Sequence, residues 1–123
     1  MRNSGIGFIG LGQMGLGMAN NLAKITTPFY AYDAMPAATE RLNGDEIIIA
    51  STVGNLAANC HLIFLCLPSA KEVNEVIFGA GGIAELAQGD LAIIDTSTID
   101  RLEAIAIHDQ LASRGITYAD CPI

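Results

Sequence analysis

The segment IGFIGLGQMGLGMANNL, residues 6–22, decides the fold of this 123-residue chain. It opens with a short apolar run at residues 6–9, which predicts a β-strand, and residues 14–24 then repeat apolar side chains with helical spacing. Between these two parts, Gly10, Gly12 and Gly15 form the pattern GxGxxG. A strand, a glycine-rich turn and a helix in this order predict a turn that binds a phosphate group.

Strand-like runs and helical patterns alternate along the rest of the chain. We predict further strands at residues 28–33, 46–50, 62–68, 91–98 and 116–123, and helices at residues 36–44, 55–60, 69–78, 83–88 and 100–113. Parallel neighbours need connections that return over a face of the sheet, so six strands separated by helices require a mostly parallel six-stranded sheet. We therefore expect one α/β domain of the doubly wound Rossmann type over residues 1–123.

The glycines of the motif have separate expected tasks. Gly10 makes the tight turn, Gly12 lets a pyrophosphate approach the backbone, and Gly15 lets the helix pack closely on the strand. The phosphate charge then rests on the helix N-terminus, where free N–H groups point outward. Gly7 and Gly17 lie outside the motif and are expected to serve packing only. The alternative is that all these glycines merely allow close helix packing.

Asp33 is the second landmark of a dinucleotide site. It follows the predicted second strand, 18 residues after Gly15, close to the usual spacing of about 20. An acid at this place accepts hydrogen bonds from the adenosine ribose and repels a 2′-phosphate, so we expect NAD rather than NADP. The alternative is an ordinary solvated carboxylate at a strand end.

The composition excludes several classes of function. The formal net charge is −7 and the basic residues are scattered, which excludes a nucleic-acid partner. The longest apolar run, residues 62–67, is too short to span a membrane. Three cysteines without CxxC spacing indicate buried free thiols in a reducing, cytoplasmic setting rather than a metal site.

The chain is also unusually apolar, with 51% hydrophobic and only 15% charged residues. The charged share lies well below the roughly 25% typical of soluble domains. Either the strands are covered on both faces, or an apolar surface serves self-association or a helical partner.

Residues 8–22, FIGLGQMGLGMANNL, resemble the N-terminal signature of the 3-hydroxyacid dehydrogenases, the group that contains 3-hydroxyisobutyrate dehydrogenase and tartronate semialdehyde reductase. Residues 62–83, 91–100 and 115–123 resemble later segments of that family, in the same order. The resemblance implies the NAD(P)-binding domain of an oxidoreductase that transfers a hydride between a nicotinamide cofactor and a small 3-hydroxy acid.

The resemblance also implies cofactor contacts along the chain. Backbone N–H groups of Gln13 and Met14 would face the pyrophosphate. Leu67, Pro68 and Ser69 would lie against the adenosine half of the cofactor or its ribose.

Two threonines follow from the same resemblance. Thr98, together with Thr96, would lie near the nicotinamide ribose. Each polar residue has an alternative: Ser69 caps the helix that follows it in a capping box with Glu72, and the threonines hydrogen-bond at the strand end.

The chain also departs from the family pattern. Asp100 and Arg101 stand where most members have a proline, and Cys121 replaces an alanine. The family's Ser-Gly-Gly segment, catalytic lysine and all-helical second domain would come after residue 123, and Lys24 and Lys71 are expected to be solvated. We therefore expect a chain that binds cofactor without catalytic residues of its own. The alternatives are a stand-alone binding module or a nonfunctional fragment.

Overall fold

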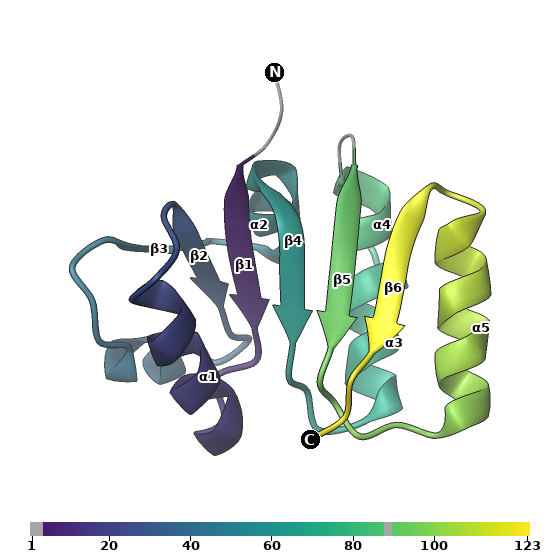
Figure 1. Cartoon of the computed structure of the whole chain (residues 1–123), viewed down its shortest axis with the longest axis horizontal. Coiled ribbons are helices and arrows are strands. Elements are labelled where there is room, and N and C mark those ends of the chain that lie inside the picture. Colours follow the sequence, from purple (N-terminus) through teal and green to yellow (C-terminus); the bar gives the residue numbers. More distant parts are fainter. Residues whose placement is uncertain (1–3, 88–89) are drawn as a thin grey trace.

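Six strands form one sheet in the computed structural model, which describes residues 4–87 and 90–123. They are β1 (Gly5–Ile9), β2 (Phe29–Tyr32), β3 (Ile47–Ile49), β4 (Cys60–Leu65), β5 (Leu91–Asp95) and β6 (Ile116–Asp120). Their order is β3-β2-β1-β4-β5-β6 and every neighbouring pair is parallel (Figure 1). The prediction of a six-stranded α/β sheet of the Rossmann type is confirmed.

The helices fill the predicted connections. They are α1 (Gln13–Ala23), the 3₁₀ helix η1 (Pro36–Arg41), α2 (Val53–Asn59), α3 (Ala70–Phe78), α4 (Ile83–Leu86) and α5 (Arg101–Ala112). Among the described residues, no helix combines the length and the apolar character needed to cross a membrane.

The predicted strands at 62–68, 91–98 and 116–123 end earlier, at Leu65, Asp95 and Asp120, and three helices differ from the predictions by two or more residues. The helix after β2 is a short 3₁₀ turn that ends before Gly44, because Leu42 adopts extended backbone and packs against the core. The helix α2 begins earlier than predicted, because the Thr52 side chain caps it by accepting the N–H of Asn55 at 3.0 Å. The predicted helix over residues 83–88 ends at Leu86, and its last position, Gln88, lies outside the described residues.

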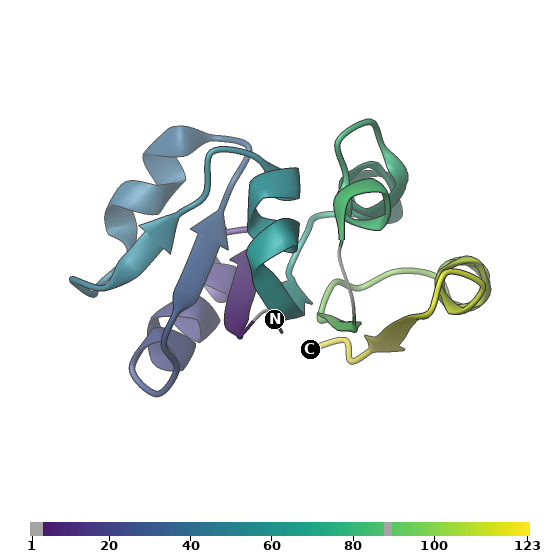
Figure 2. The same ribbon diagram turned by 90° about the horizontal axis from the view of Figure 1, so that it is seen from above.

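Two apolar clusters lie on opposite faces of the sheet. The first joins α1 to β1 and β2 through buried residues that include Phe8, Ala19 and Phe29. The second joins α2, α3, α4 and α5 to the other face; Leu56, Ile77 and many further buried residues belong to it. Figure 2 shows α1 on one side of the sheet and α2, α3 and α4 on the other. The fold is therefore doubly wound.

The two halves of the sheet are not covered equally. On the α1 side, the helix lies over β1 and β2, whereas β4, β5 and β6 face the viewer in Figure 1 without a helix in front of them. Side chains of β5 and β6 on that face, such as Ile94 and Ala119, are half-buried or exposed. Part of the sheet is therefore covered on both faces, and part of it is covered on one face only.

Candidate functional site

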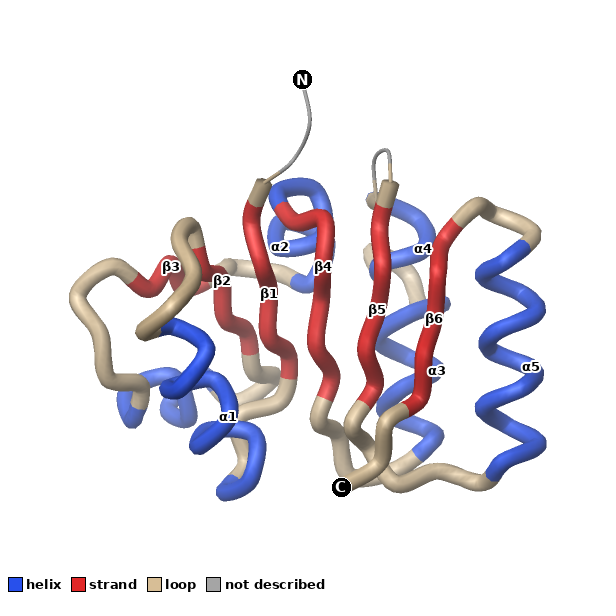
Figure 3. The backbone as a smooth tube through the Cα atoms, in the orientation of Figure 1, coloured by secondary structure: helices blue, strands red, loops and turns tan. Residues whose placement is uncertain are grey.

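A cavity of about 510 Å³ lies at the carboxyl ends of β1, β2 and β4. The loops that follow these strands gather at that edge of the sheet (Figure 3). The edge lies where the strand order reverses, between β1 and β4, which is the place at which open α/β sheets bind their ligands. Eight of the predicted site residues line the cavity: Gly10, Gly12, Gln13, Met14, Gly15, Asp33, Leu67 and Pro68.

The glycine-rich turn forms one wall of the cavity because only glycine fits two of its positions. Gly10 has φ +103°, and a Cβ there would collide with the carbonyl oxygen of Cys66. A Cβ at Gly15 would collide with the carbonyl oxygen of Gly10. By contrast, a Cβ at Gly12 would meet no atom within 4 Å, so the space beside this residue is open. The turn is thus tightly packed on the sheet side and open on the cavity side.

The two glycines outside the motif behave differently from each other. A Cβ at Gly7 would collide with Leu56 of α2, so the expected packing role of Gly7 is confirmed. A Cβ at Gly17 would meet nothing within 4 Å, so the expected packing role of Gly17 is wrong. This glycine lies on the exposed side of α1 and contacts no neighbouring element there.

The first turn of α1 faces the cavity with Gln13 and Met14. Its N-cap is Gly12, whose lack of a side chain leaves the first N–H groups without a capping acceptor. The first turn holds no acidic residue. The positive end of the helix dipole is therefore not neutralised from within the helix, and an anion would be stabilised there.

Asp33 faces the cavity from the end of β2 and connects two loops. Its Oδ2 accepts the N–H of Leu11 at 2.7 Å, and its Oδ1 accepts the N–H of Met35 at 2.8 Å. The half-buried carboxylate thus fixes the glycine-rich turn relative to the end of β2, which excludes the reading of Asp33 as an ordinary solvated acid. Each oxygen keeps a further lone pair for another donor.

Leu67 and Pro68 form the opposite wall, in the turn between β4 and α3. The N–H of Cys66 is donated to the carbonyl oxygen of Ile9 at 3.0 Å, which ties this turn to β1. The N–H of Leu67 is donated to the Ser97 hydroxyl at 2.8 Å, which ties it to the segment after β5. The turn is therefore held from both sides.

Ser69, Thr96 and Thr98 do not line this cavity. Ser69 precedes α3, but its hydroxyl donates to the Glu72 carboxylate and accepts no backbone N–H, so that half of the predicted capping box is not formed. That bond holds the pKa of Glu72 below its usual value. The Thr96 hydroxyl donates to the carbonyl oxygen of Leu65 at 2.7 Å, the strand-end bond of the alternative interpretation. Thr98 is exposed at the same edge of the sheet.

A buried polar cluster lies beside these residues; the sequence indicates Asp95 as a strand-end acid that holds nearby loops, but its partners Ser97 and Tyr118 were missed. Asp95 is fully buried at the end of β5; its Oδ1 accepts the N–H of Ser97 at 2.9 Å and its Oδ2 accepts the hydroxyl of Tyr118 at 2.6 Å. Burial, and then the bond to Asp95, raise the pKa of Tyr118. The strand β5 ends at Asp95 rather than at residue 98 as predicted. The chain turns there, because the N–H of Ser97 bonds to the Asp95 carboxylate. The acid at the end of an apolar strand was the signal for Asp95, whereas no signal in the sequence marks its two partners.

The described residues contain no group of three or more His, Cys, Asp and Glu side chains placed to hold a metal ion. Cys60 is buried, and this burial raises the pKa of its thiol to about 12. Cys66 is half-buried, whereas Cys121 is exposed, so the prediction of a buried thiol is wrong for Cys121. The reason is its place beyond β6, where no helix covers the chain.

A family model described as the NAD binding domain of 6-phosphogluconate dehydrogenase matches residues 5–123. The chain is 34% identical over 118 residues to 2-(hydroxymethyl)glutarate dehydrogenase of Eubacterium barkeri, covering 96% of this chain and 39% of that protein. It is 33% identical to the mitochondrial 3-hydroxyisobutyrate dehydrogenase of Mus musculus, covering 96% of this chain and 35% of that protein.

A comparison with a solved structure supports the fold. The 3-hydroxyisobutyrate dehydrogenase of Mycobacterium tuberculosis superposes with a TM-score of 0.86 over 98% of this chain and 40% of that chain, at 24% identity. At this identity the likeness shows the fold alone. The chain spans about two fifths of the length of the proteins that it matches.

Proposed function

Because this chain belongs to the family of NAD-binding domains of 6-phosphogluconate dehydrogenase, we propose that it binds NAD in the cavity at the carboxyl ends of β1, β2 and β4. The resemblance to the 3-hydroxyacid dehydrogenases is confirmed by the relatives that carry such names. The single observation that carries the proposal is that eight predicted residues, from three separate loops, line one cavity.

The pyrophosphate is assigned to the open side of the glycine-rich turn. The space beside Gly12 is the part of the turn that a Cβ would narrow without any collision inside the protein. The first-turn N–H groups at Gln13 and Met14 lie next to it and need an acceptor. A dinucleotide phosphate would supply both the acceptor and the negative charge that this helix end favours.

The adenosine ribose is assigned to Asp33, and the charges around it favour NAD over NADP. Asp33, Glu72 and Glu75 line the cavity, and its described lining contains no lysine or arginine. At a separation of about 4 Å, two unit charges repel by about 1 kcal/mol in water and by about 4 kcal/mol near a protein surface. A 2′-phosphate would meet this repulsion without a compensating cation.

The remaining predicted residues are assigned by their place along the same edge. Leu67 and Pro68 offer an apolar wall to the adenosine half. Thr98 follows β5, one strand further on, and is assigned to the nicotinamide ribose. Thr96 already donates its hydroxyl to Leu65, so we assign it to holding β4 and β5 together. Ser69 is directed at Glu72 and is assigned to the outer rim of the site.

For a protein of the length of the relatives, we propose hydride transfer between NAD and a small 3-hydroxy acid, with the nicotinamide as hydride acceptor or donor. Among the described residues, no lysine lines the cavity: Lys24 ends α1 near the amino ends of the strands, and Lys71 is exposed on α3. The catalytic lysine expected from the resemblance is therefore proposed for a segment outside this sequence. A cytoplasmic location stays a prediction.

Titration of the purified chain with NADH and with NADPH, followed by nicotinamide fluorescence, tests the cofactor. We expect saturable NADH binding and NADPH binding weaker by about tenfold or more, the effect of about 1.4 kcal/mol. No binding of either nucleotide would overturn the proposed site. Equal or tighter NADPH binding would overturn the role given to Asp33.

Two glycines of the same helix region provide a matched test of the pyrophosphate position. Gly12→Val fills the open space beside the turn, and its extended backbone at φ −66° suits any residue, so we expect intact folding and lost NADH binding. Gly17→Ala also enters open space but does not line the cavity, so affinity should stay the same while helix stability rises by about 0.5–1 kcal/mol. Undiminished binding by Gly12→Val would contradict the assignment.

Self-association or a helical partner is the second candidate function. It is favoured by the face of β4, β5 and β6 that no helix covers in Figure 1, and by the exposed apolar side chains Leu102 and Ile105 on α5. Light scattering of the purified chain over a concentration series tests self-association. If the chain is a monomer at every concentration, self-association is excluded and only binding of a separate helical partner remains as the second candidate function.

A further inference from the structure

We propose that Ser97 is a positioning residue of the dinucleotide site, which holds the Leu67 and Pro68 wall in place and is itself fixed by Asp95 and Tyr118. This inference rests on the proposed function of the cavity. None of these three polar residues lines the cavity, so each would act through the wall and not by touching the nucleotide.

The first step is the bond between Ser97 and the wall. The Ser97 hydroxyl accepts the N–H of Leu67 at 2.8 Å, and only 3% of the Ser97 residue surface is exposed. Pro68 has no N–H of its own, so Leu67 supplies the last backbone donor before the α3 helix region begins at Ser69. Without the hydroxyl, this part-buried N–H would lose its partner inside the protein.

The second step is the way in which Ser97 is held. The N–H of Ser97 is donated to Asp95, whose carboxylate is fully buried and also accepts the Tyr118 hydroxyl. The carboxylate thus receives one donor from the chain that follows β5 and one from β6. Hydrogen bonds to a charged acceptor are shorter and stronger than neutral ones, which makes this a rigid support.

The third step is the fit of the wall against the glycine-rich turn. Gly10 lies so close to the carbonyl oxygen of Cys66 that a Cβ would collide with it, and the Leu67 side chain lies beside the same point. A shift of the Leu67 and Pro68 turn therefore changes two walls of the cavity together. The geometry of the nucleotide site depends in this way on a hydroxyl that comes 30 residues later in the chain.

The test measures two quantities on the full chain: the NADH dissociation constant and the hydrogen exchange rate of the Leu67 amide. For Ser97→Ala we expect faster exchange at Leu67 and NADH binding weaker by about five- to tenfold, the usual net effect of one hydrogen bond. Ser97→Thr keeps the hydroxyl and should restore both. ADP-ribose should lose the same factor as NADH, because the wall faces the adenosine half.

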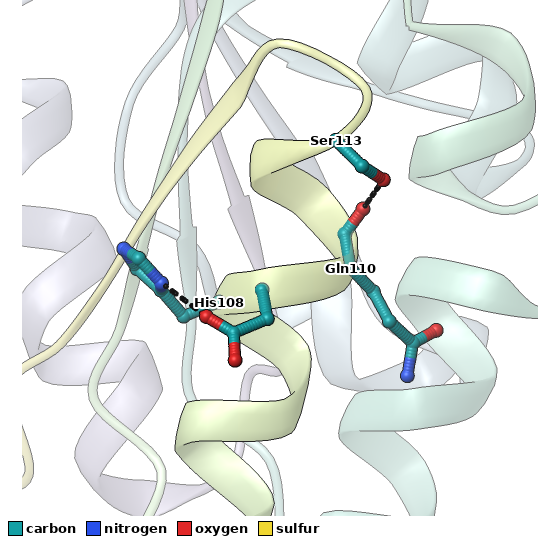
Figure 4. Close-up of polar contacts among 4 residues, drawn as sticks. His108, Gln110 and Ser113 are labelled. Atoms are coloured by element: carbon teal, nitrogen blue, oxygen red, sulfur yellow. Dashed lines mark hydrogen bonds and ion pairs between the residues drawn. The ribbon is translucent and has the colours of Figure 1, made fainter.

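Ser113→Ala is the matched control. The Ser113 hydroxyl donates to the carbonyl oxygen of Gln110 at 2.7 Å at the end of α5 (Figure 4), and neither residue lines the cavity. This variant also removes a bond between a serine hydroxyl and the backbone, here one that the hydroxyl donates, so it should lower stability slightly and leave NADH affinity and Leu67 exchange unchanged. An equal loss of affinity in this control would overturn the inference, because it would show a general effect of destabilisation.

The outcomes separate this inference from the proposed function. If the wild-type chain binds no dinucleotide, the proposed function fails and the inference fails with it. If the wild-type chain binds NADH and Ser97→Ala binds it equally well, only the inference fails. Should Ser97→Ala not fold, Tyr118→Phe removes one donor to Asp95 and keeps the ring; a loss of affinity of about twofold or more supports the inference, and no loss overturns it.

Discussion

An aspartate stands at the carboxyl end of β2 and another at the carboxyl end of β5, but the two have different roles. Asp33 directly follows β2 and Asp95 is the last residue of β5, and each carboxylate accepts two hydrogen bonds, one of them from the N–H two residues later. Asp33 is half-buried and faces the cavity, and its other donor is the backbone of Leu11. Asp95 is fully buried, and its other donor is the side chain of Tyr118.

The two carboxylates differ in whether they can accept a further hydrogen bond from a ligand. The exposed side of Asp33 can accept a further donor from a ligand, so it can support the loops and bind at once. The carboxylate of Asp95 is enclosed by protein, so its whole effect is on the position of neighbouring segments. A strand-end aspartate is therefore a candidate ligand contact only where its second side meets a cavity.

Removal of Asp95 should have the largest effect. Asp95→Ala leaves the Tyr118 hydroxyl and the Ser97 N–H buried without an acceptor, so we expect a loss of about 3 kcal/mol or more in the free energy of unfolding. Urea unfolding followed by circular dichroism measures it. A loss below about 1 kcal/mol would mean that water reaches these groups and that the two strand ends are alike.

Removal of Asp33 should act mainly on binding. Asp33→Ala is expected to weaken NADH binding by about tenfold and to narrow or reverse the preference over NADPH, while the unfolding free energy falls by only about 1–2 kcal/mol. The control is Asp109→Ala, since Asp109 is exposed on α5 and faces His108 at 3.3 Å (Figure 4). Undiminished NADH affinity in Asp33→Ala would break the comparison.

The stability of the folded chain at alkaline pH should reveal the hydrogen bond between Tyr118 and the buried Asp95. The pKa of Tyr118 is raised in the folded chain by burial and by Asp95, so its contribution to stability is full below about pH 10, where an unfolded tyrosine ionises. That contribution is lost as the pH rises further. Wild type should therefore lose more stability between pH 8 and pH 11 than Tyr118→Phe, as measured by urea midpoints. Equal losses would contradict the buried bond.

The smallest effect concerns a third carboxylate, that of Glu72, which is held mainly by the Ser69 side chain. The Ser69 hydroxyl, and to a smaller extent other contacts, lower the pKa of Glu72. Ser69→Ala should raise that pKa toward its ordinary value, as measured by NMR titration. Because the pKa of Glu72 is lower in the folded chain than in the unfolded chain, the bond stabilises the folded chain at pH values above the ordinary pKa. This stabilisation is lost as the pH falls through the lowered pKa. An unchanged titration would show that the hydroxyl does not hold this acid.

The sequence predicted the parts of the site that depend on local geometry. Gly10, Gly12 and Gly15 were assigned to a turn by their spacing, and Asp33 was found by its distance from them. Their place on one cavity follows because the carboxyl ends of parallel strands meet at one edge of the sheet.

The contacts that support the site could not be predicted in this way. Ser97 meets Leu67 across 30 residues and Tyr118 meets Asp95 across 23, and neither pairing leaves a periodic signal. The strand pattern through residues 91–98 even hid the turn after Asp95, because the local propensity continued while a carboxylate bond ended the strand. The exposure of Cys121 could not be predicted either, because it depends on whether another element packs over the segment after β6, and the composition does not show this.

The bond from Leu67 to Ser97 also joins two segments that are made at different times during synthesis. The glycine-rich turn, Asp33 and the Leu67 and Pro68 wall are all made before β5 leaves the ribosome. The hydroxyl that secures the wall comes later, and Tyr118 later still. The residues that line the cavity are therefore all present before the residues that we propose to support its Leu67 and Pro68 wall.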